Sequence, residues 1–326
     1  MSSKFSTFIC QNCGSETSQY FGRCVNCNEW NTIVEERKNT RAKTINVNKS
    51  KKSKLFNEIE IETASRFTSG FKEFDRVLGG GIVPGSIVLL GGEPGIGKST
   101  IVLQSAGKIS LNEKVLYITA EESLEQVKIR WERLNQNSLD LKIYAETNLS
   151  LIIEEIKKIK PGFAIIDSIQ AINNDEMESA PGSVSQVRTC SSELQNLAKE
   201  NNIALLIIGH VTKDGALAGP KTLEHLVDVV LNFEGDNIAS HRLLRSVKNR
   251  FGSTFEIGIF EMLENGLREV INPSSIFTNK ENISGVTTTI TNEGSRPFAV
   301  DIQALVNKTF YNNPRRTTTG ISINRL

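Results

Sequence analysis

Residues 86–100 constrain the fold more than any other part of the chain. A run of apolar residues at 86–90 leads directly into Gly92-Glu-Pro-Gly-Ile-Gly-Lys-Ser-Thr100, which has the pattern G-x4-G-K-S, and a segment typical of a helix follows at 101–109. A glycine-rich loop between a strand and the N-terminus of a helix points backbone N–H groups at phosphate oxygens. The sequence therefore predicts a P-loop, in which the Lys98 ammonium contacts the β- and γ-phosphates of a nucleoside triphosphate and the Ser99 hydroxyl binds Mg²⁺. The expected nucleotide contacts are Gly92, Glu93, Pro94, Gly95, Ile96, Gly97, Lys98, Ser99 and Thr100.

A second apolar strand, at residues 115–119, ends at Ala120-Glu121-Glu122. A carboxylate at the carboxyl end of a strand beside the phosphate loop can polarise the water that attacks the γ-phosphate. We favour Glu121 for this general base and keep Glu122 as the alternative. Both residues also suit the N-terminus of a following helix, where acidic side chains interact favourably with the helix dipole.

A third strand, at residues 163–168, carries four apolar residues before Asp167. This pattern indicates a Walker B carboxylate, which reaches the magnesium shell through water. A fourth apolar strand, at 203–208, leads to His210 and to a polar loop whose tip can sense the γ-phosphate. His210 is as often a structural residue as a functional one.

These strands alternate with segments typical of helices at 71–78, 101–109, 124–134, 150–159 and 184–201. Near-continuous apolar strands separated by helices are typical of a sheet that is covered on both faces. The sequence therefore predicts an α/β fold with a mainly parallel sheet.

Four of the five cysteines form two pairs, Cys10-x2-Cys13 and Cys24-x2-Cys27, within eighteen residues. Each pair can turn around one metal ion, so the four thiolates predict a structural Zn²⁺ site with tetrahedral coordination and no open position for water. Two disulfides, or a redox-active pair, are the alternative, which a reducing compartment disfavours. The fifth cysteine, Cys190, has the pattern of a buried small hydrophobic residue, and we give it no role.

The charge of the chain is balanced overall but unevenly distributed. The 326 residues carry 38 Lys and Arg against 37 Asp and Glu, which gives a formal net charge of +1 and no global reason to expect nucleic acid. Residues 37–54, however, hold eight Lys or Arg and no Asp or Glu. We expect a mobile tether here, and whether its charges are only solvated or contact a phosphate backbone stays open.

The apolar runs are too short for the roughly 18–20 residues of a membrane span. Residues 1–9 lack the basic start and apolar stretch of a secretory signal. We expect a cytoplasmic protein that does not contact a membrane.

Several motifs occur together in this chain. They are the four-cysteine module, Phe74-Asp-Arg-Val-Leu-Gly-Gly-Gly-Ile82, the P-loop, Glu121-Glu-Ser123, Ile165-Ile-Asp-Ser-Ile-Gln170 and Lys248-Asn-Arg-Phe-Gly252. The set closely resembles the RadA (Sms) family of bacterial DNA repair ATPases, which belongs to the RecA-like superfamily, and the resemblance extends over essentially the whole chain. It implies a DNA-dependent ATPase of the helicase or branch-migration type, which uses ATP, Mg²⁺ and Zn²⁺ and processes recombination intermediates. It also implies a homo-hexameric ring that acts on single-stranded and branched DNA and is linked in function to the RecA recombinase.

The resemblance also assigns residues. It implies that Cys10, Cys13, Cys24 and Cys27 are the zinc ligands, that 92–100 is the nucleotide loop and that Asp167 is the magnesium-side carboxylate. It adds Lys248 and Arg250, which belong to the family signature. Lys and Arg at alternate positions of a strand share one face, and a guanidinium delivered across a subunit interface stabilises charge that develops on a phosphate. Without the resemblance, the two would be ordinary strand charges facing water.

Two segments resemble the loops that line the central channel of RecA-like rings, namely residues 177–188 and 212–223. Their basic residues Arg188, Lys213 and Lys221 can meet DNA phosphates. Either segment can equally be a plain surface loop.

The expected organisation has four parts: a zinc finger at 1–33, a basic linker at 34–58, a RecA-like ATPase domain at 59–273, and a linker with an incomplete Lon-protease-like domain of the ribosomal S5-like α+β type at 274–326. In that last part we expect strands at 298–306 and 317–323 that can pair. The family's domain is much longer, so the chain reads as a fragment or as a naturally truncated protein. Two other functions stay open: a regulatory RecA-like ATPase that acts on protein, and a form that binds nucleotide or DNA without motor activity.

Overall fold

The computed structural model describes residues 6–10, 14–37, 55, 66–136, 138, 140–209, 222–235, 240–279, 283–310 and 315–325. Cys13, His210, Lys213, Lys221 and most of the predicted basic linker lie outside the described residues. The chain divides into two compact units, Met1–Ile271 with Glu293–Ser295, and Asn272–Asn292 with Arg296–Leu326.

The centre of the first unit is a nine-stranded sheet with the strand order β12-β11-β10-β9-β4-β8-β7-β5-β6. The strands from β9 to β6 run parallel to their neighbours in this order. They are β4 (Ile87–Gly92), β5 (Val115–Thr119), β6 (Leu141–Ala145), β7 (Phe163–Asp167), β8 (Ala204–Ile208) and β9 (Val229–Gly235). The predicted α/β class and mainly parallel sheet are confirmed, and four of these strands were expected from their apolar runs.

An antiparallel extension continues the sheet beyond β9. It consists of β10 (His241–Asn249), β11 (Ile257–Leu263) and β12 (Gly266–Glu269). The pairing of β10 with β9 shifts register between Ser246 and Lys248, which is the signature of a β-bulge. The bulge lies just before the end of β10 and therefore changes how the last residues of the strand are presented.

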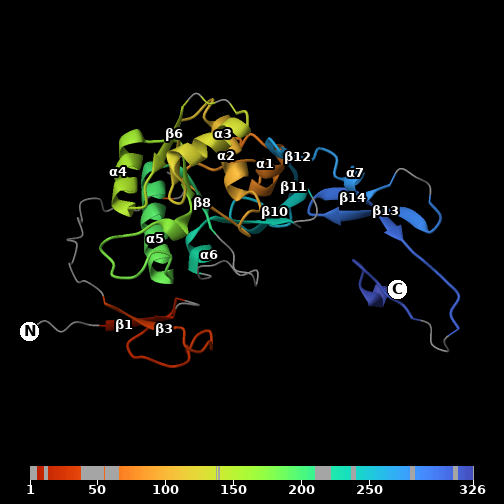
Figure 1. The fold of residues 1–326 in the computed structure, drawn as a ribbon, viewed down its shortest axis with the longest axis horizontal. Coiled ribbons are helices and arrows are strands. Elements are labelled where there is room, and N and C mark those ends of the chain that lie inside the picture. Colours follow the sequence, from red (N-terminus) through yellow and green to blue (C-terminus); the bar gives the residue numbers. More distant parts are fainter. Residues whose placement is uncertain are drawn as a thin grey trace, which may run out of the picture. The chain divides into compact units, whose positions relative to one another are not determined.

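Helices cover both faces of the sheet, as Figure 1 shows. Helices α1 (Lys72–Leu78), α2 (Lys98–Ile109) and α3 (Leu124–Arg133) pack on one face, and α4 (Leu149–Ile159) and α5 (Val184–Asn201) pack on the other. Side chains of a strand point alternately to the two faces, so Val88 and Leu90 join the first core while Ile87 and Leu89 join the second. Full burial on both faces explains why β4 reads as an unbroken apolar run.

The N-terminal segment forms a small antiparallel sheet of its own. Its strands are β1 (Ser6–Cys10), β2 (Glu16–Thr17) and β3 (Ile33–Arg37), in the order β2-β1-β3. The core of this module is little more than Cys10, Cys24 and Ile33. So small a core rarely holds a fold without a metal or disulfides.

The second unit holds the short helix α7 (Ser274–Phe277) and a hairpin of β13 (Val286–Glu293) and β14 (Arg296–Gln303). The predicted strand at 298–306 corresponds to β14, but its predicted pairing with residues 317–323 is wrong. The tight turn between β13 and β14 contains Gly294, whose φ of 62° suits the left-handed conformation that such a turn needs. The partner strand is therefore the one that immediately precedes β14. Among the described residues, no helix is long and apolar enough to cross a membrane.

Candidate nucleotide site and zinc ribbon

The predicted P-loop joins the end of β4 to the start of α2, because β4 ends at Gly92 and α2 begins at Lys98. Gly97 is the N-cap of α2 and has a φ of 114°. A Cβ atom at Gly97 would lie 2.6 Å from Cε of Met262, and this positive φ is one that residues with a side chain rarely adopt, so a side chain there would be strained. A Cβ atom at Gly95, in contrast, would meet nothing within 4 Å. The loop is thus packed against the sheet at its base and open at its tip, which fits a cradle for phosphate.

The Lys98 side chain lies inside this loop. The residue is buried, and its Nζ donates hydrogen bonds to the carbonyl oxygens of Gly92 at 2.8 Å and Glu93 at 2.9 Å. Burial lowers the pKa of Lys98, and the negative charges of Asp167 and Glu121 oppose that shift. The ammonium group therefore lies within electrostatic reach of the predicted general base Glu121 and of the predicted magnesium-side carboxylate Asp167.

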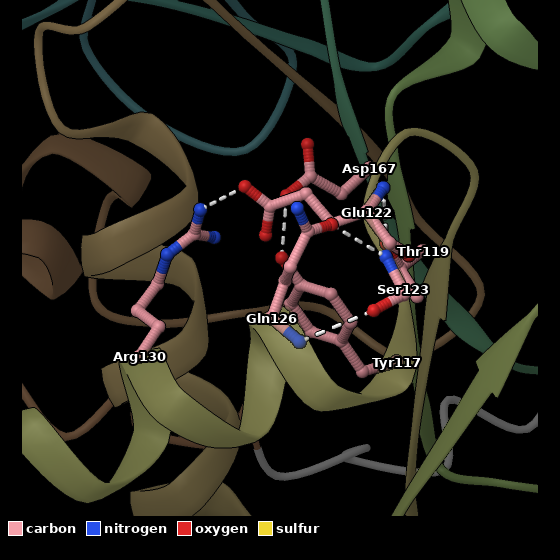
Figure 2. Close-up of polar contacts among 7 residues, drawn as sticks. All are labelled: Tyr117, Thr119, Glu122, Ser123, Gln126, Arg130 and Asp167. Atoms are coloured by element: carbon pink, nitrogen blue, oxygen red, sulfur yellow. Dashed lines mark hydrogen bonds and ion pairs between the residues drawn. The ribbon is translucent and has the colours of Figure 1, made fainter.

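Asp167 lies at the end of β7, opposite Thr119 at the end of β5. Its Oδ2 accepts a hydrogen bond of 2.5 Å from the hydroxyl of Tyr117, which is fully buried in β5 (Figure 2). Burial and the neighbouring Asp167 charge raise the pKa of Tyr117 well above its usual value. Asp167 thus has a fixed hydrogen-bond donor beneath it.

Glu121, which the sequence analysis favours as the base, and its alternative Glu122 have different environments. Oε1 of Glu121 accepts a hydrogen bond from the hydroxyl of Ser168, the residue after Asp167. Oε1 of Glu122 instead forms an ion pair with Arg130 of α3 (Figure 2). Glu121 therefore lies beside the Walker B strand, whereas Glu122 fastens the turn to α3.

The cap of α3 is formed by neither glutamate. Ser123 is the N-cap residue and makes a capping box with Gln126 (Figure 2). This arrangement satisfies the first free N–H groups of the helix, so a role for Glu121 as a cap is not needed.

The basic pair Lys248 and Arg250 contacts α6 (Thr222–Leu226) and the two residues that join it to β9. Nζ of Lys248 donates to the carbonyl oxygens of Glu224 at 2.5 Å and Val227 at 2.8 Å. Nη1 of Arg250 lies 3.0 Å from Oδ1 of the buried Asp228, while 53% of the Arg250 side chain stays exposed. Burial lowers the pKa of Lys248, and the Arg250 charge adds to the effect.

The other residues of the Lys248–Gly252 motif attach its turn to the end of α1. Nδ2 of Asn249 donates to the carbonyl oxygen of Val77 at 3.1 Å, and Oδ1 of Asn249 accepts from the N–H of Phe251 at 2.8 Å. A Cβ atom at Gly252 would lie only 2.9 Å from Cα of Gly79, so these two glycines permit a close approach of backbones. The motif thus divides into basic side chains and residues that hold their turn in place.

Of the two candidate DNA segments, only residues 177–188 lie within the described part of the chain, together with the last two residues of 212–223. Nε2 of Gln186 donates to the carbonyl oxygens of Asn174 and Ser179, which ties the segment to the connection after β7. Arg188 follows on α5 and is exposed. The segment is therefore an ordered approach to α5 that presents a basic side chain.

The N-terminal module with strands β1 to β3, called the zinc ribbon from here on, brings three of the four predicted zinc ligands together. The thiol sulfurs of Cys10, Cys24 and Cys27 all lie within 4.8 Å of one another. Each pair begins the same turn, since the N–H of Gly14 donates to the carbonyl oxygen of Cys10 at 2.8 Å and the N–H of Asn28 donates to that of Cys24 at 2.9 Å. Among the described cysteines, which are these three and Cys190, no disulfide is formed. Soft sulfur donors converging on one point from two such turns fit Zn²⁺.

Three residues around these sites were not predicted from the sequence: Tyr117, Arg130 and Asp228. The signal for Tyr117 was a hydroxyl in an otherwise apolar strand next to a strand that ends in aspartate. The signal for Asp228 was a charge directly before the buried strand β9. Arg130 offered none, because a basic residue in the last turn of a helix is common.

Comparisons with protein families match both modules. Residues 8–35 match the rubredoxin metal binding domain, and residues 67–154 match the KaiC family of ATPases. These matches assign ATP and Mg²⁺ to the central domain and Zn²⁺ to the ribbon.

A solved structure of another protein shows the same fold in the central domain. The crystal structure of a KaiC-like protein from the hyperthermophilic archaeon Pyrococcus horikoshii superposes with a TM-score of 0.52 at 21% identity. The superposition covers 64% of this chain and 99% of that protein. At this identity the likeness shows the RecA-like fold alone.

The zinc assignment predicts the effect of removing one thiolate. The purified chain should contain about one zinc ion, and Cys24→Ser should lower that content sharply because three thiolates hold the ion less tightly. Nucleotide binding by the central domain should persist. Cys190→Ser, at a cysteine buried in α5, is the matched control and should keep its zinc. Metal analysis that finds unchanged zinc in Cys24→Ser would contradict the site.

Curated relatives cover nearly the whole chain. The DNA repair protein RadA of Listeria monocytogenes is 50% identical over 325 residues, which span 98% of this chain and 71% of the relative. RadA of Synechocystis sp. is 49% identical over 354 residues and 70% of its length, and RadA of Streptococcus pyogenes serotype M6 is 50% identical over 333 residues and 73% of its length. The chain therefore belongs to the RadA family of DNA repair proteins, and its central domain is an ATP-hydrolysing domain.

Proposed function

We propose that this protein is a DNA-dependent ATPase that processes recombination intermediates and promotes branch migration during recombinational DNA repair. The observation that carries the catalytic part is the grouping of Lys98, Asp167 and Glu121 at one edge of the sheet, where β4, β7 and β5 end. The curated relatives, which are named as DNA repair proteins, support the DNA part.

In the proposed reaction, the P-loop amides and Lys98 bind the phosphates of ATP. Ser99 and Asp167 would hold Mg²⁺, which would supply positive charge to the phosphate groups. Glu121 accepts a proton from the attacking water while the water oxygen forms a bond to the γ-phosphorus. The bond from that phosphorus to the bridging oxygen breaks, and its electron pair leaves with ADP. Ser168 holds the Glu121 carboxylate beside the Walker B strand in this account.

This assignment predicts that two neighbouring glutamates behave differently. Glu121→Gln should lower the rate of ATP hydrolysis about a hundredfold or more while ATP still binds, because the general base is lost and the phosphate contacts stay. Glu122→Gln is the matched control, and it should have a smaller effect because Glu122 acts only through its ion pair with Arg130. Single-turnover hydrolysis and nucleotide binding separate the two. Equal losses, or a larger loss in Glu122→Gln, would move the base to Glu122.

The proposal includes assembly into a hexameric ring, with Arg250 acting at the nucleotide of the neighbouring subunit. Arg250 is suited to this role because its guanidinium is half exposed while Asp228 anchors it. Lys248 shares the same segment, and its ammonium must leave two carbonyl oxygens before it can contact a phosphate. We therefore propose Arg250 as the residue that acts across the interface, with Lys248 as the second candidate.

A mixing experiment tests action across an interface. Arg250→Ala should lower ATP turnover about a thousandfold, the lower end of what arginine fingers contribute, and Lys98→Ala should abolish turnover at its own site because the phosphates lose the ammonium. Mixed rings should recover activity, because a Lys98→Ala subunit can supply Arg250 to the intact P-loop of an Arg250→Ala subunit. If a mass measurement shows that the rings contain both variants and ATP turnover still does not recover, a role of Arg250 in trans is contradicted. Arg245→Ala, at a partly exposed position of β10 where the guanidinium pairs with Glu234, is the control and should stay active.

The proposed partners are single-stranded and branched DNA, with a functional link to the RecA recombinase and a cytoplasmic location. Arg188 is the described residue that we propose for a phosphate contact, and Lys213 and Lys221 extend the proposal to residues outside the described part. The division into a zinc finger, a basic linker, an ATPase domain and a Lon-like segment, at boundaries near 33, 58 and 273, belongs to the same proposal.

DNA binding should be electrostatic and therefore sensitive to salt. The affinity for a fluorescent single-stranded oligonucleotide, measured by anisotropy, should fall linearly on a log–log plot as the salt concentration rises. Arg188→Ala should lower that slope by about one. Arg133→Ala, at an exposed position of α3, should leave the slope unchanged. Affinity that does not respond to salt would instead favour a regulatory ATPase that acts on protein.

A further inference from the structure

The hydroxyl of Tyr117 stands out in the core of the ATPase domain. On the face of β5 that packs against α2 and α3, Val115 and Tyr117 belong to the first hydrophobic core. Phenylalanine would fill the same volume without burying a polar group. A buried hydroxyl destabilises the fold unless it has a partner, and the partner here is Asp167 at 2.5 Å. The tyrosine is therefore explained by what its hydroxyl does for that carboxylate.

The strand pairing brings the hydroxyl to Asp167. In the register of β5 and β7, Tyr117 pairs with Ile165, and Thr119 pairs with Asp167. Tyr117 and Asp167 thus lie on the same face of the sheet, two residues apart along the strand direction. The phenol ring spans that offset, so the hydroxyl approaches Asp167 from inside the core.

The contact engages only one of the two carboxylate oxygens. Tyr117 donates to Oδ2, and Figure 2 shows the other oxygen of Asp167 pointing away from the tyrosine. Rotation of the carboxylate about its last side-chain bond would break the hydrogen bond. One fixed oxygen therefore sets the direction of the other. The charge of Asp167 also acts on the Lys98 ammonium in the P-loop, which places this carboxylate at the nucleotide site.

The surroundings keep the tyrosine in place. Its ring is fully buried, and the Glu122–Arg130 ion pair lies beside it where the β5–α3 turn leaves the strand (Figure 2). The hydroxyl of Thr119 donates to the carbonyl oxygen of Glu122 at 2.9 Å and accepts from the Glu122 N–H at 3.1 Å, which fixes the start of that turn. The donor is thus held by rigid elements on two sides, as precise positioning requires.

We propose that Tyr117 is a positioning residue for the magnesium side of the nucleotide site: its hydroxyl fixes one oxygen of Asp167 so that the other faces Mg²⁺ bound with the nucleotide. This inference rests on the proposed role of Asp167. Tyr117 touches neither nucleotide nor metal and acts only through the aspartate. Its removal should therefore weaken the part of nucleotide affinity that depends on Mg²⁺ and leave the part due to the P-loop.

The test compares Tyr117→Phe with the wild-type chain in the binding of a fluorescent ADP analogue. With Mg²⁺ present, the affinity of Tyr117→Phe should fall about tenfold, the usual effect of losing a hydrogen bond to a charged group. With EDTA, both chains should bind equally, which also shows that the P-loop is folded. Tyr144→Phe removes a hydroxyl from the neighbouring strand β6 and is the matched control, with no change expected in either condition.

A double-mutant cycle with Asp167→Asn identifies the route of the effect. If Tyr117 acts through Asp167, then Tyr117→Phe should lower the Mg²⁺-dependent affinity no further in the Asp167→Asn background. Unchanged affinity of Tyr117→Phe in Mg²⁺, an equal loss in EDTA, or a full additional loss in the Asp167→Asn background would each overturn the proposal. Failure of the proposed function is a separate result, because a wild-type chain without ATP turnover still reports Mg²⁺-dependent ADP binding.

Discussion

The buried ammonium of Lys98 is the interaction on which the site depends. A charge removed from water requires hydrogen bonds and opposite charges, and here two loop carbonyls supply the first while Asp167 and Glu121 supply the second. The hydrogen bonds from Lys98 to the carbonyl oxygens of Gly92 and Glu93 also hold the P-loop in its curved conformation. A bound phosphate would compensate for part of the hydration that the Lys98 ammonium loses on burial. The loop therefore favours anionic ligands for the same reason that it needs the two carbonyl oxygens and the two carboxylates.

The sheet brings the residues of the proposed catalytic site together. Parallel pairing places the carboxyl ends of β4, β8, β7 and β5 along one edge, so the P-loop, Asp167 and the turn with Glu121 meet although they are far apart in the sequence. Beneath that edge, Tyr117 anchors Asp167, and Ser168 anchors Glu121. The antiparallel extension adds Lys248, near the end of β10, and Arg250, just after it. Both are held by the segment before β9, Lys248 through the carbonyl oxygen of Val227 and Arg250 through Asp228. The proposed division of labour between one subunit's loop and its neighbour's Arg250 follows from this layout.

The sequence predicted the parts of the structure whose signals are local. The P-loop, the four buried parallel strands and the helix at residues 184–201 have unbroken apolar runs or fixed motifs, and the structure confirms them as elements. The edge strand β6 was not predicted, because its side chains are only partly buried and its pattern is weak. The predicted pairing of residues 298–306 with 317–323 was wrong, because the turn at Gly294 lets β14 pair with β13, the strand directly before it. Tyr117, Arg130 and Asp228 depend on which strands and helices are neighbours, and so does the difference between Glu121 and Glu122. A single sequence does not carry that information.

The central claim is that this fold couples ATP hydrolysis to DNA. The most direct measurement is the steady-state rate of ATP turnover by the purified chain, with and without single-stranded DNA and beside the Lys98→Ala variant. The account predicts turnover that DNA stimulates and that Lys98→Ala abolishes under both conditions. Turnover that is unaffected by DNA, or that survives in Lys98→Ala, would contradict it.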